Sequence, residues 1–88
     1  MPWGLEFSDA AKDALDELDR PVRARLDKFF ERLSAHPDPR AIGAPLVGVL
    51  AGRWRYRVGA YRIICAIRHD VLIIEVIKIG HRREVYRQ

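Results

Sequence analysis

The segment that decides the fold is RWRYRVGAYRIICAIR, residues 53–68. In its first half arginine alternates with large apolar residues, which is the period of a β-strand with one polar and one apolar face. Gly59-Ala60 then supplies a turn, and Tyr61–Arg68 is rich in β-branched and aromatic residues. The segment therefore predicts two antiparallel strands joined by a tight turn.

A third strand is predicted directly after this pair. His69-Asp70 gives a second turn, and Val71–Ile79 is apolar on both faces, which is typical of a central strand. Gly80 is expected to end this strand, and residues 81–88 are expected to form a polar tail.

The N-terminal half predicts one strand and two helices. Trp3–Phe7 alternates as a short strand, and Ser8 stands where a helix N-cap belongs. Apolar residues at helical spacing follow to Leu18, and Pro21 suits the first turn of a second helix that continues to about Ala35. The order β-α-α-β-β-β predicts an α+β fold, in which a helical hairpin packs on one face of a twisted antiparallel sheet.

Two expectations concern the core. Phe29 and Leu33 lie on one face of the second helix and are expected to be buried against the sheet. Prolines and glycines keep the stretch between helices and strands irregular. Leu46, Val49 and Leu50 are expected to attach this stretch to the core.

The charge of the chain is unevenly distributed. Residues 1–50 carry 7 basic and 9 acidic side chains, a net −2, whereas residues 51–88 carry 9 basic and 3 acidic ones, a net +6. A basic half that is rich in arginine points to a polyanionic or carboxylate-bearing partner. The plainer alternative is a solvated basic surface with no dedicated partner.

The composition also places the chain in a cellular setting. The single cysteine, Cys65, excludes an intramolecular disulfide framework and suits a reducing cytosol. Glu6, Asp9 and Lys12 interrupt the start, which argues against a signal peptide, and the apolar runs are far too short to span a membrane. We expect a cytoplasmic chain whose residues 1–88 form a single domain without membrane contact.

A stripe of arginines is the main candidate for function. Arg53, Arg55 and Arg57 lie on one face of their predicted strand, and Arg62 on the next strand can sit beside them. Like charges on one strand face repel one another, so the stripe does nothing for sheet stability. A solvent-exposed sheet face tolerates such a pattern, and this reading stays open beside a functional one.

More polar residues follow the third strand of this set. They are His81, Arg82, Arg83 and Tyr86. In a meander the end of one strand lies near the start of the strand before it, so the Arg82 region can approach the Arg62 end of its neighbour. The three histidines and Cys65 are too scattered for a zinc signature, and we expect no metal and no cofactor.

Such a set of residues suits phosphodiester chemistry without a metal. Guanidinium groups bind phosphate oxygens bidentately and stay charged at physiological pH. They can therefore neutralise the extra charge of a pentacoordinate phosphorane as it forms. A tyrosine surrounded by arginines has its phenolate stabilised and can act as a general base.

Two motifs resemble a known family. Gly59–Arg62, of the form G-x-Y-R, and Gly80–Tyr86, of the form G-H-R-x-E-V-Y, are similar to the RelE family of the RelE/ParE toxin superfamily. The order of strands and helices resembles that family over nearly the whole chain. The resemblance implies a toxin of a type II toxin–antitoxin system. Its partners would be a cognate RelB-like antitoxin, the ribosome and mRNA.

The resemblance further implies a metal-independent endoribonuclease that cleaves mRNA in the ribosomal A site by attack of the 2′-OH. Carried over residue by residue, Arg55 and Arg57 match basic residues that bind phosphate and stabilise the transition state, and Arg62 matches the arginine of the tyrosine-arginine pair. Arg82 matches the arginine that assists the leaving group, and Tyr86 matches the proposed base. The remaining basic positions, expected to bind RNA, are Arg53, His81 and Arg83.

Other classes of function remain open at this point. ParE-type relatives share the fold but inhibit DNA gyrase without catalysis, and a generic basic binding module is a third reading. Arginine stands at the first two positions where some relatives have lysine, so a lysine-like base is not available there.

Overall fold

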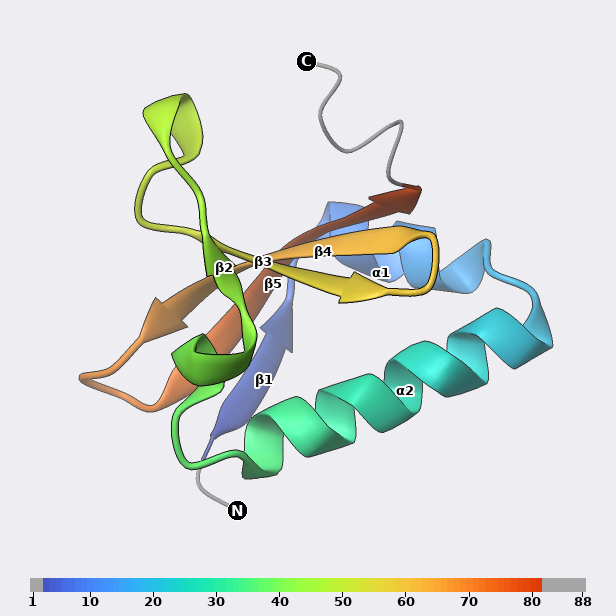
Figure 1. Cartoon of the computed structure of the whole chain (residues 1–88). Coiled ribbons are helices and arrows are strands. Elements are labelled where there is room, and N and C mark those ends of the chain that lie inside the picture. The colour runs from blue at the N-terminus through green and yellow to red at the C-terminus, as the bar shows by residue number, and fades with distance from the viewer. Residues whose placement is uncertain (1–2, 82–88) are drawn as a thin grey trace.

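The computed structural model describes residues 3–81 (Figure 1). The elements in chain order are β1 (Gly4–Phe7), α1 (Asp9–Asp16), α2 (Arg20–Ala35), the 3₁₀ helix η1 (Pro39–Ile42), β2 (Ala44–Pro45), the 3₁₀ helix η2 (Gly48–Leu50), β3 (Trp54–Val58), β4 (Tyr61–Arg68) and β5 (Ile73–His81). The predicted α+β class and the order of the main elements are confirmed. Neither α-helix of this part of the chain has the length and apolar content needed to cross a bilayer.

The strands form one sheet in the order β1-β5-β4-β3-β2. The predicted antiparallel meander of β3, β4 and β5 is confirmed, but β1 runs parallel to β5, so the sheet is mixed instead of purely antiparallel. Tight turns force antiparallel pairing only between consecutive strands. Because two helices separate β1 from the meander, the crossover allows β1 to pair in parallel.

The central strand is displaced from its predicted position. It begins at Ile73, since Val71 and Leu72 belong to the turn before it, where Leu72 has a φ of 55°. It also continues through Gly80, which pairs with Arg62 on β4. Gly80 is therefore a ladder residue of the sheet, and the prediction that it ends the strand was wrong.

A bulge in β5 sets which side chains face the helices. Ile64 pairs with Lys78 and Cys65 pairs with Val76, so Ile77 is an extra residue on β5. The bulge shifts the alternation of side chains by one position. Val76 and Ile79 consequently both lie in the core, which explains why the strand is apolar on both faces in sequence.

Ser8 holds this bulge to the first helix. Its Oγ donates to the carbonyl of Ile77 at 2.6 Å and accepts from the amide of Ala11 at 3.0 Å, as expected of an N-cap. The backbone amide of Ser8 also donates to the carbonyl of Val76 at 2.9 Å. One residue thus ends β1, caps α1 and satisfies the carbonyl of the bulged residue.

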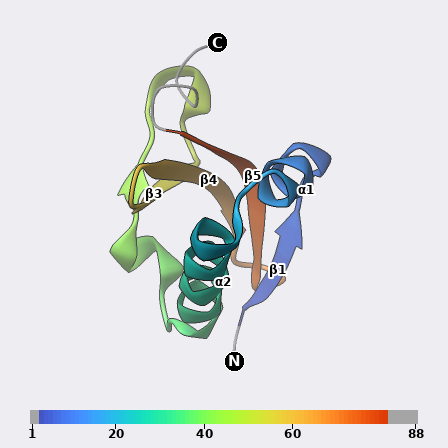
Figure 2. The same cartoon turned by 90° about the vertical axis from the view of Figure 1, so that its right-hand side faces the viewer.

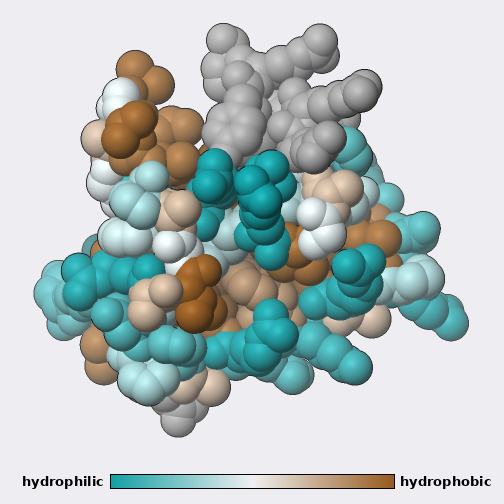
Figure 3. All heavy atoms as spheres, viewed as in Figure 1, coloured by the Kyte–Doolittle hydropathy of each residue, from teal (hydrophilic) through white to brown (hydrophobic). Residues whose placement is uncertain are grey.

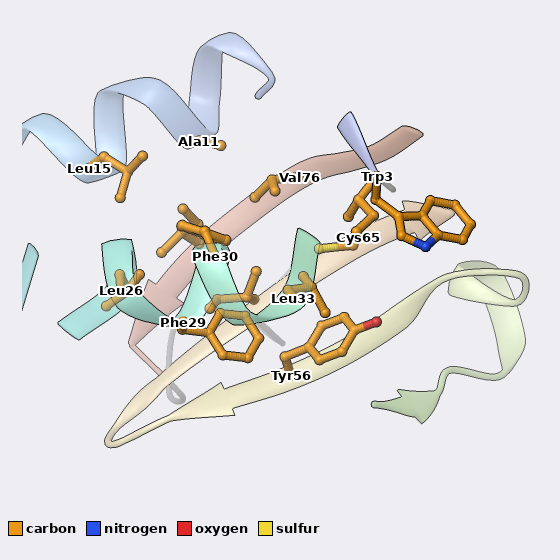
Figure 4. Packing of buried hydrophobic residues seen from close by; sticks show 13 residues of the cluster. Trp3, Ala11, Leu15, Leu26, Phe29, Phe30, Leu33, Tyr56, Cys65 and Val76 are labelled. Carbon is orange, nitrogen blue, oxygen red and sulfur yellow. The ribbon is translucent and has the colours of Figure 1, made fainter. Parts of the chain in front are cut away.

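Both helices cover the same face of the sheet. In Figure 2 α2 is seen nearly end-on beneath the arch of β3, β4 and β5, with α1 beside β1 and β5. Phe29 and Leu33 of α2 are buried as predicted, and the ring of Phe29 lies 5.6 Å from that of Tyr56 (Figure 4). Cys65 and Ile63 belong to the same core cluster.

The segment between β2 and β3 departs from the prediction. Val49 is fully exposed at 101% and Val47 is 85% exposed, so Val49 does not attach this segment to the core. Leu46 and Leu50 are half-buried but do not pack against the core cluster. The brown atoms at the upper left of Figure 3 mark the segment around η2, which projects from the body of the protein (Figure 1). Gly48 and Gly52, with φ values of 69° and 91°, turn the backbone away from the sheet.

We predict that Ser8→Ala lowers the free energy of unfolding by about 1–2 kcal/mol, because it removes the N-cap acceptor and the bond to the bulge together. The measurement is urea denaturation followed by circular dichroism. Ser34→Ala is the matched control, since Ser34 Oγ donates only to Glu31 in the same helix and the change should cost under about 0.5 kcal/mol. Equal losses for the two variants would contradict this role of Ser8.

Candidate functional site

A row of residues crosses three strands on the face away from the helices. Arg57 of β3 lies opposite Arg62 of β4, and Arg62 lies opposite Gly80 of β5. The neighbouring Tyr56 and Ile63 are in the core, so side-chain alternation places the row on the other face of the sheet. The predicted approach of Arg62 to the arginine stripe is confirmed.

A second row runs beside the first on the same face. Arg55 lies opposite Ile64, and Ile64 lies opposite Lys78. Ile64 is only 2% exposed although it faces away from the helices. Arg53 comes directly before β3 and is half-buried. The two rows therefore bring four cationic side chains, from three adjacent strands, onto one patch of the sheet.

Arg62 differs from the other cations of this patch because it is buried, with 9% of its surface exposed. Its Nε has no hydrogen-bond partner within residues 3–81. A buried N–H group of a cation without an acceptor is unfavourable, so this arrangement does not serve stability. Opposite it, Gly80 has no side chain, and glycine within a strand often marks a point where a ligand approaches closely. Arg57 at the other end of the row is exposed.

His81 does not join the arginine row. It pairs with Tyr61, and the two rings meet edge to face at 5.8 Å. They line a hollow of about 280 Å³ together with Glu17 and Leu18, on the side of α1. The predicted residues Arg82, Arg83 and Tyr86 lie outside the described residues. The last described residue, His81, lies beside Tyr61, at the Arg62 end of β4.

The strand that carries Arg55 and Arg57 is fixed from behind by Tyr56. The hydroxyl of Tyr56 donates to the carbonyl of Pro39 at 2.8 Å, and its burial raises the pKa of the phenol well above the usual range. A side chain at Gly43 would come within 2.7 Å of the Tyr56 ring, so the contact requires glycine there. Tyr56 stays neutral and serves as a support, not as an acid or base.

Two further groups bear on the chemistry. Burial raises the pKa of the Cys65 thiol to about 12, so Cys65 is a core residue and not a nucleophile. Lys78 was not predicted as part of the patch, because the bulge that orients it has no signature in the apolar sequence of β5. Within the described part of the chain, no three His, Cys, Asp or Glu side chains gather as a metal site.

The patch can bind and polarise a phosphodiester. Arg57 and Arg62 lie on adjacent strands and can contact one phosphate from two sides. A guanidinium that is already removed from water pairs with an anion more strongly than an exposed one does, because the local dielectric constant is low. Its surroundings also need little reorganisation when negative charge develops on the phosphate. Such a patch is suited to binding nucleic acid.

Fold and sequence together identify the class of protein. The family model described as ParE toxin of type II toxin–antitoxin system, parDE, matches residues 5–86. The chain belongs to this family, the RelE/ParE superfamily of toxins.

Individual relatives point to its RelE branch. Toxin RelG of Mycobacterium tuberculosis is 30% identical over 89 residues, which cover 100% of both chains. The structure is similar to a chain of the toxin–antitoxin complex RelBE2 of Mycobacterium tuberculosis, with a TM-score of 0.82 and 29% identity over 93% of this chain and 100% of that one. It is also similar to a chain of the archaeal RelE–RelB complex of Pyrococcus horikoshii, with a TM-score of 0.75 and 25% identity over 96% and 99% of the two chains.

We predict that Arg62→Met leaves the free energy of unfolding unchanged or raises it by about 1–2 kcal/mol, because it replaces a buried cation by an apolar side chain of similar length. Arg57→Met, at an exposed position of the same row, should change it by less than about 0.5 kcal/mol. Denaturation midpoints in urea measure both. A loss above about 2 kcal/mol in Arg62→Met would show that the guanidinium stabilises the fold.

Proposed function

We propose that this protein is a ribosome-dependent endoribonuclease, the toxin of a type II toxin–antitoxin pair, which cleaves mRNA in the ribosomal A site and so inhibits translation. The observation that carries the proposal is the Arg57–Arg62–Gly80 row, in which a buried arginine, whose Nε has no hydrogen-bond partner within residues 3–81, pairs across the sheet with a residue that has no side chain. The similarity of the chain to RelE-type toxins supports the same function.

The reaction needs a base, an acid and stabilisation of charge. The ribose 2′-OH loses its proton and its oxygen attacks the adjacent phosphorus. The bond from phosphorus to the 5′-oxygen breaks, which leaves a 2′,3′-cyclic phosphate and a 5′-hydroxyl that takes up a proton. Arg55, Arg57 and Arg62 hold the phosphate and offset the charge of the phosphorane.

The other roles in the proposal follow from the family resemblance. Tyr86 is the base that removes the proton from the 2′-OH, and Arg82 assists the leaving oxygen. Arg53, His81 and Arg83 bind RNA around this centre. For His81 this means contact from the Tyr61 side of β5, because its ring is turned away from the row.

The alternative is a non-catalytic toxin of the ParE type that inhibits DNA gyrase. The match of residues 5–86 to the ParE toxin model keeps this function in consideration. Inhibition of supercoiling by the purified chain, without RNA cleavage, would favour it.

We predict that the purified protein cleaves a reporter mRNA only when ribosomes are present. Arg62→Gln, Arg82→Ala and Tyr86→Phe should each reduce kcat by about 10²–10³-fold, since each removes a group that acts in the transition state. Primer extension on translating ribosomes measures the cleavage, and growth arrest on expression gives a second readout. Lys12→Gln, an exposed change on α1, is the control and should behave as the parent. Full activity in folded Tyr86→Phe would remove the tyrosine from the role of base.

The partner in the proposal is an antitoxin, since the similar structures include RelE–RelB complexes. A net +6 on residues 51–88 favours an acidic, RelB-like segment that is at least partly disordered when free. Such a segment can set carboxylates against the arginine rows and bury apolar area as it orders on binding.

We predict that association of the toxin with this antitoxin slows as salt rises from low to physiological concentration, because opposite charges steer the encounter. Stopped-flow fluorescence over a salt series measures the rate. An association rate that does not change with salt would leave only steric neutralisation of the toxin.

A further inference from the structure

Two hollows meet at the outer edge of β3. One, of about 300 Å³, is lined by Arg55 among others, and the second, of about 580 Å³, is lined by Arg32 and His36 among others. Ile42 and Arg57 line both hollows, so the two lie side by side. We name this path the edge groove: it runs from Arg55 past Arg57 and Ile42 to Arg32 and His36.

The edge groove exists because β2 is short. It pairs only with Trp54 and Arg55, so the outer edge of β3 beyond them has no strand beside it. The amide of Gly43 donates to the carbonyl of Arg40 at the end of η1, so the residues before β2 form a 3₁₀ helix and do not extend the pairing with β3. The edge groove therefore leads from the arginine face around the sheet to the C-terminal end of α2.

The edge groove is basic along its whole length. Arg55 stands at one end, Arg57 at the junction of the two hollows and Arg32 at the other end, and no Asp or Glu is among the described residues that line it. His36 Nδ1 accepts from the amide of Asp38 at 3.0 Å, so the neutral ring carries its proton on Nε2 and can donate. The carboxylate of Asp38 is engaged by Arg40 at 3.4 Å.

The edge groove also offers apolar and planar surfaces. Ile42 lies at the junction of the two hollows with 45% of its surface exposed, and it is not part of the core cluster. The guanidinium of Arg32 lies 5.7 Å from the centroid of the Phe29 ring, so the ring supports it from below. Unstacked bases of single-stranded RNA bind to such apolar side chains and guanidinium planes, while cations track the backbone.

We propose that the edge groove binds the single-stranded RNA that flanks the cleaved phosphate, with phosphates on Arg57 and Arg32 and a base against Ile42. The inference rests on the proposed function for its substrate. Arg57 belongs both to the row and to the edge groove, so an RNA held at the row continues into the edge groove without a break. A single RNA strand can occupy both the row and the edge groove, which favours RNA over a separate acidic peptide in the edge groove. The tests below distinguish the two.

The first test is kinetic. On ribosomes programmed with long mRNA, Arg32→Gln and Ile42→Glu should raise KM by about 3- to 10-fold and leave kcat within about twofold. When the mRNA is truncated to one nucleotide on the flank that enters the edge groove, the KM of each variant should equal that of the parent. Truncation of the other flank should leave the difference in KM unchanged. Lys12→Gln is the control for loss of one cation. Unchanged KM in both folded variants would overturn the proposal.

The second test does not need cleavage. A single-stranded RNA with 2′-O-methyl at the cleaved nucleotide and 4-thiouridine in the flanks is bound to the full-length protein and photocrosslinked. Crosslinks should map to residues 29–42, and Arg32→Gln should reduce the slope of log affinity against log salt by about 0.7. Crosslinks in the parent protein without any ribosomal cleavage would support the edge groove while contradicting the proposed function. Cleavage with no crosslink to residues 29–42, or an Arg32→Gln defect confined to antitoxin binding, would overturn the edge groove alone.

Discussion

The bond from the Ser8 hydroxyl to the carbonyl of Ile77 joins the first helix to the bulge in the central strand, and both faces of the sheet depend on that bulge. If Ile77 were paired regularly, the residues after it would change faces. Lys78 and Gly80 would then point at the helices and Ile79 at solvent. The bulge therefore gives β5 an apolar face at Ile74, Val76 and Ile79 and leaves no side chain at the position opposite Arg62.

Arg62 shows how the fold tolerates an unfavourable group. The core clusters around Leu26, Leu33, Ile63 and Val76, all on the helix side of the sheet, and does not need a cation on the other side. A guanidinium removed from water there lowers stability unless an anion pairs with it. Groups that lower stability are expected where binding or catalysis uses them. Arg62 is held in place by its pairing with Arg57 on β3, and Tyr56 in turn anchors β3 to the carbonyl of Pro39.

The local features of the sequence predicted most of the fold. The alternation in residues 53–58 correctly predicted that the arginines lie on the face of β3 away from Tyr56. The turn predicted at Gly59 correctly brought Arg57 beside Arg62. The parallel pairing of β1, the bulge and the burial of Arg62 could not be predicted, because they depend on contacts between segments far apart in the chain. The orientation of His81 likewise depends on the one-residue shift in β5, which no local pattern marks.

The position of β5 bears on how the protein is made. It is the last strand in residues 3–81, yet it lies between β1 and β4 in the sheet. During synthesis β1 has no strand partner until Ile73–Val76 have left the ribosome, and the carbonyl that Ser8 binds comes later still. Local contacts can form in the helices beforehand, but the sheet closes only when nearly all of this part has been translated. A nascent chain therefore lacks the complete arginine rows until β5 has left the ribosome and paired with β4.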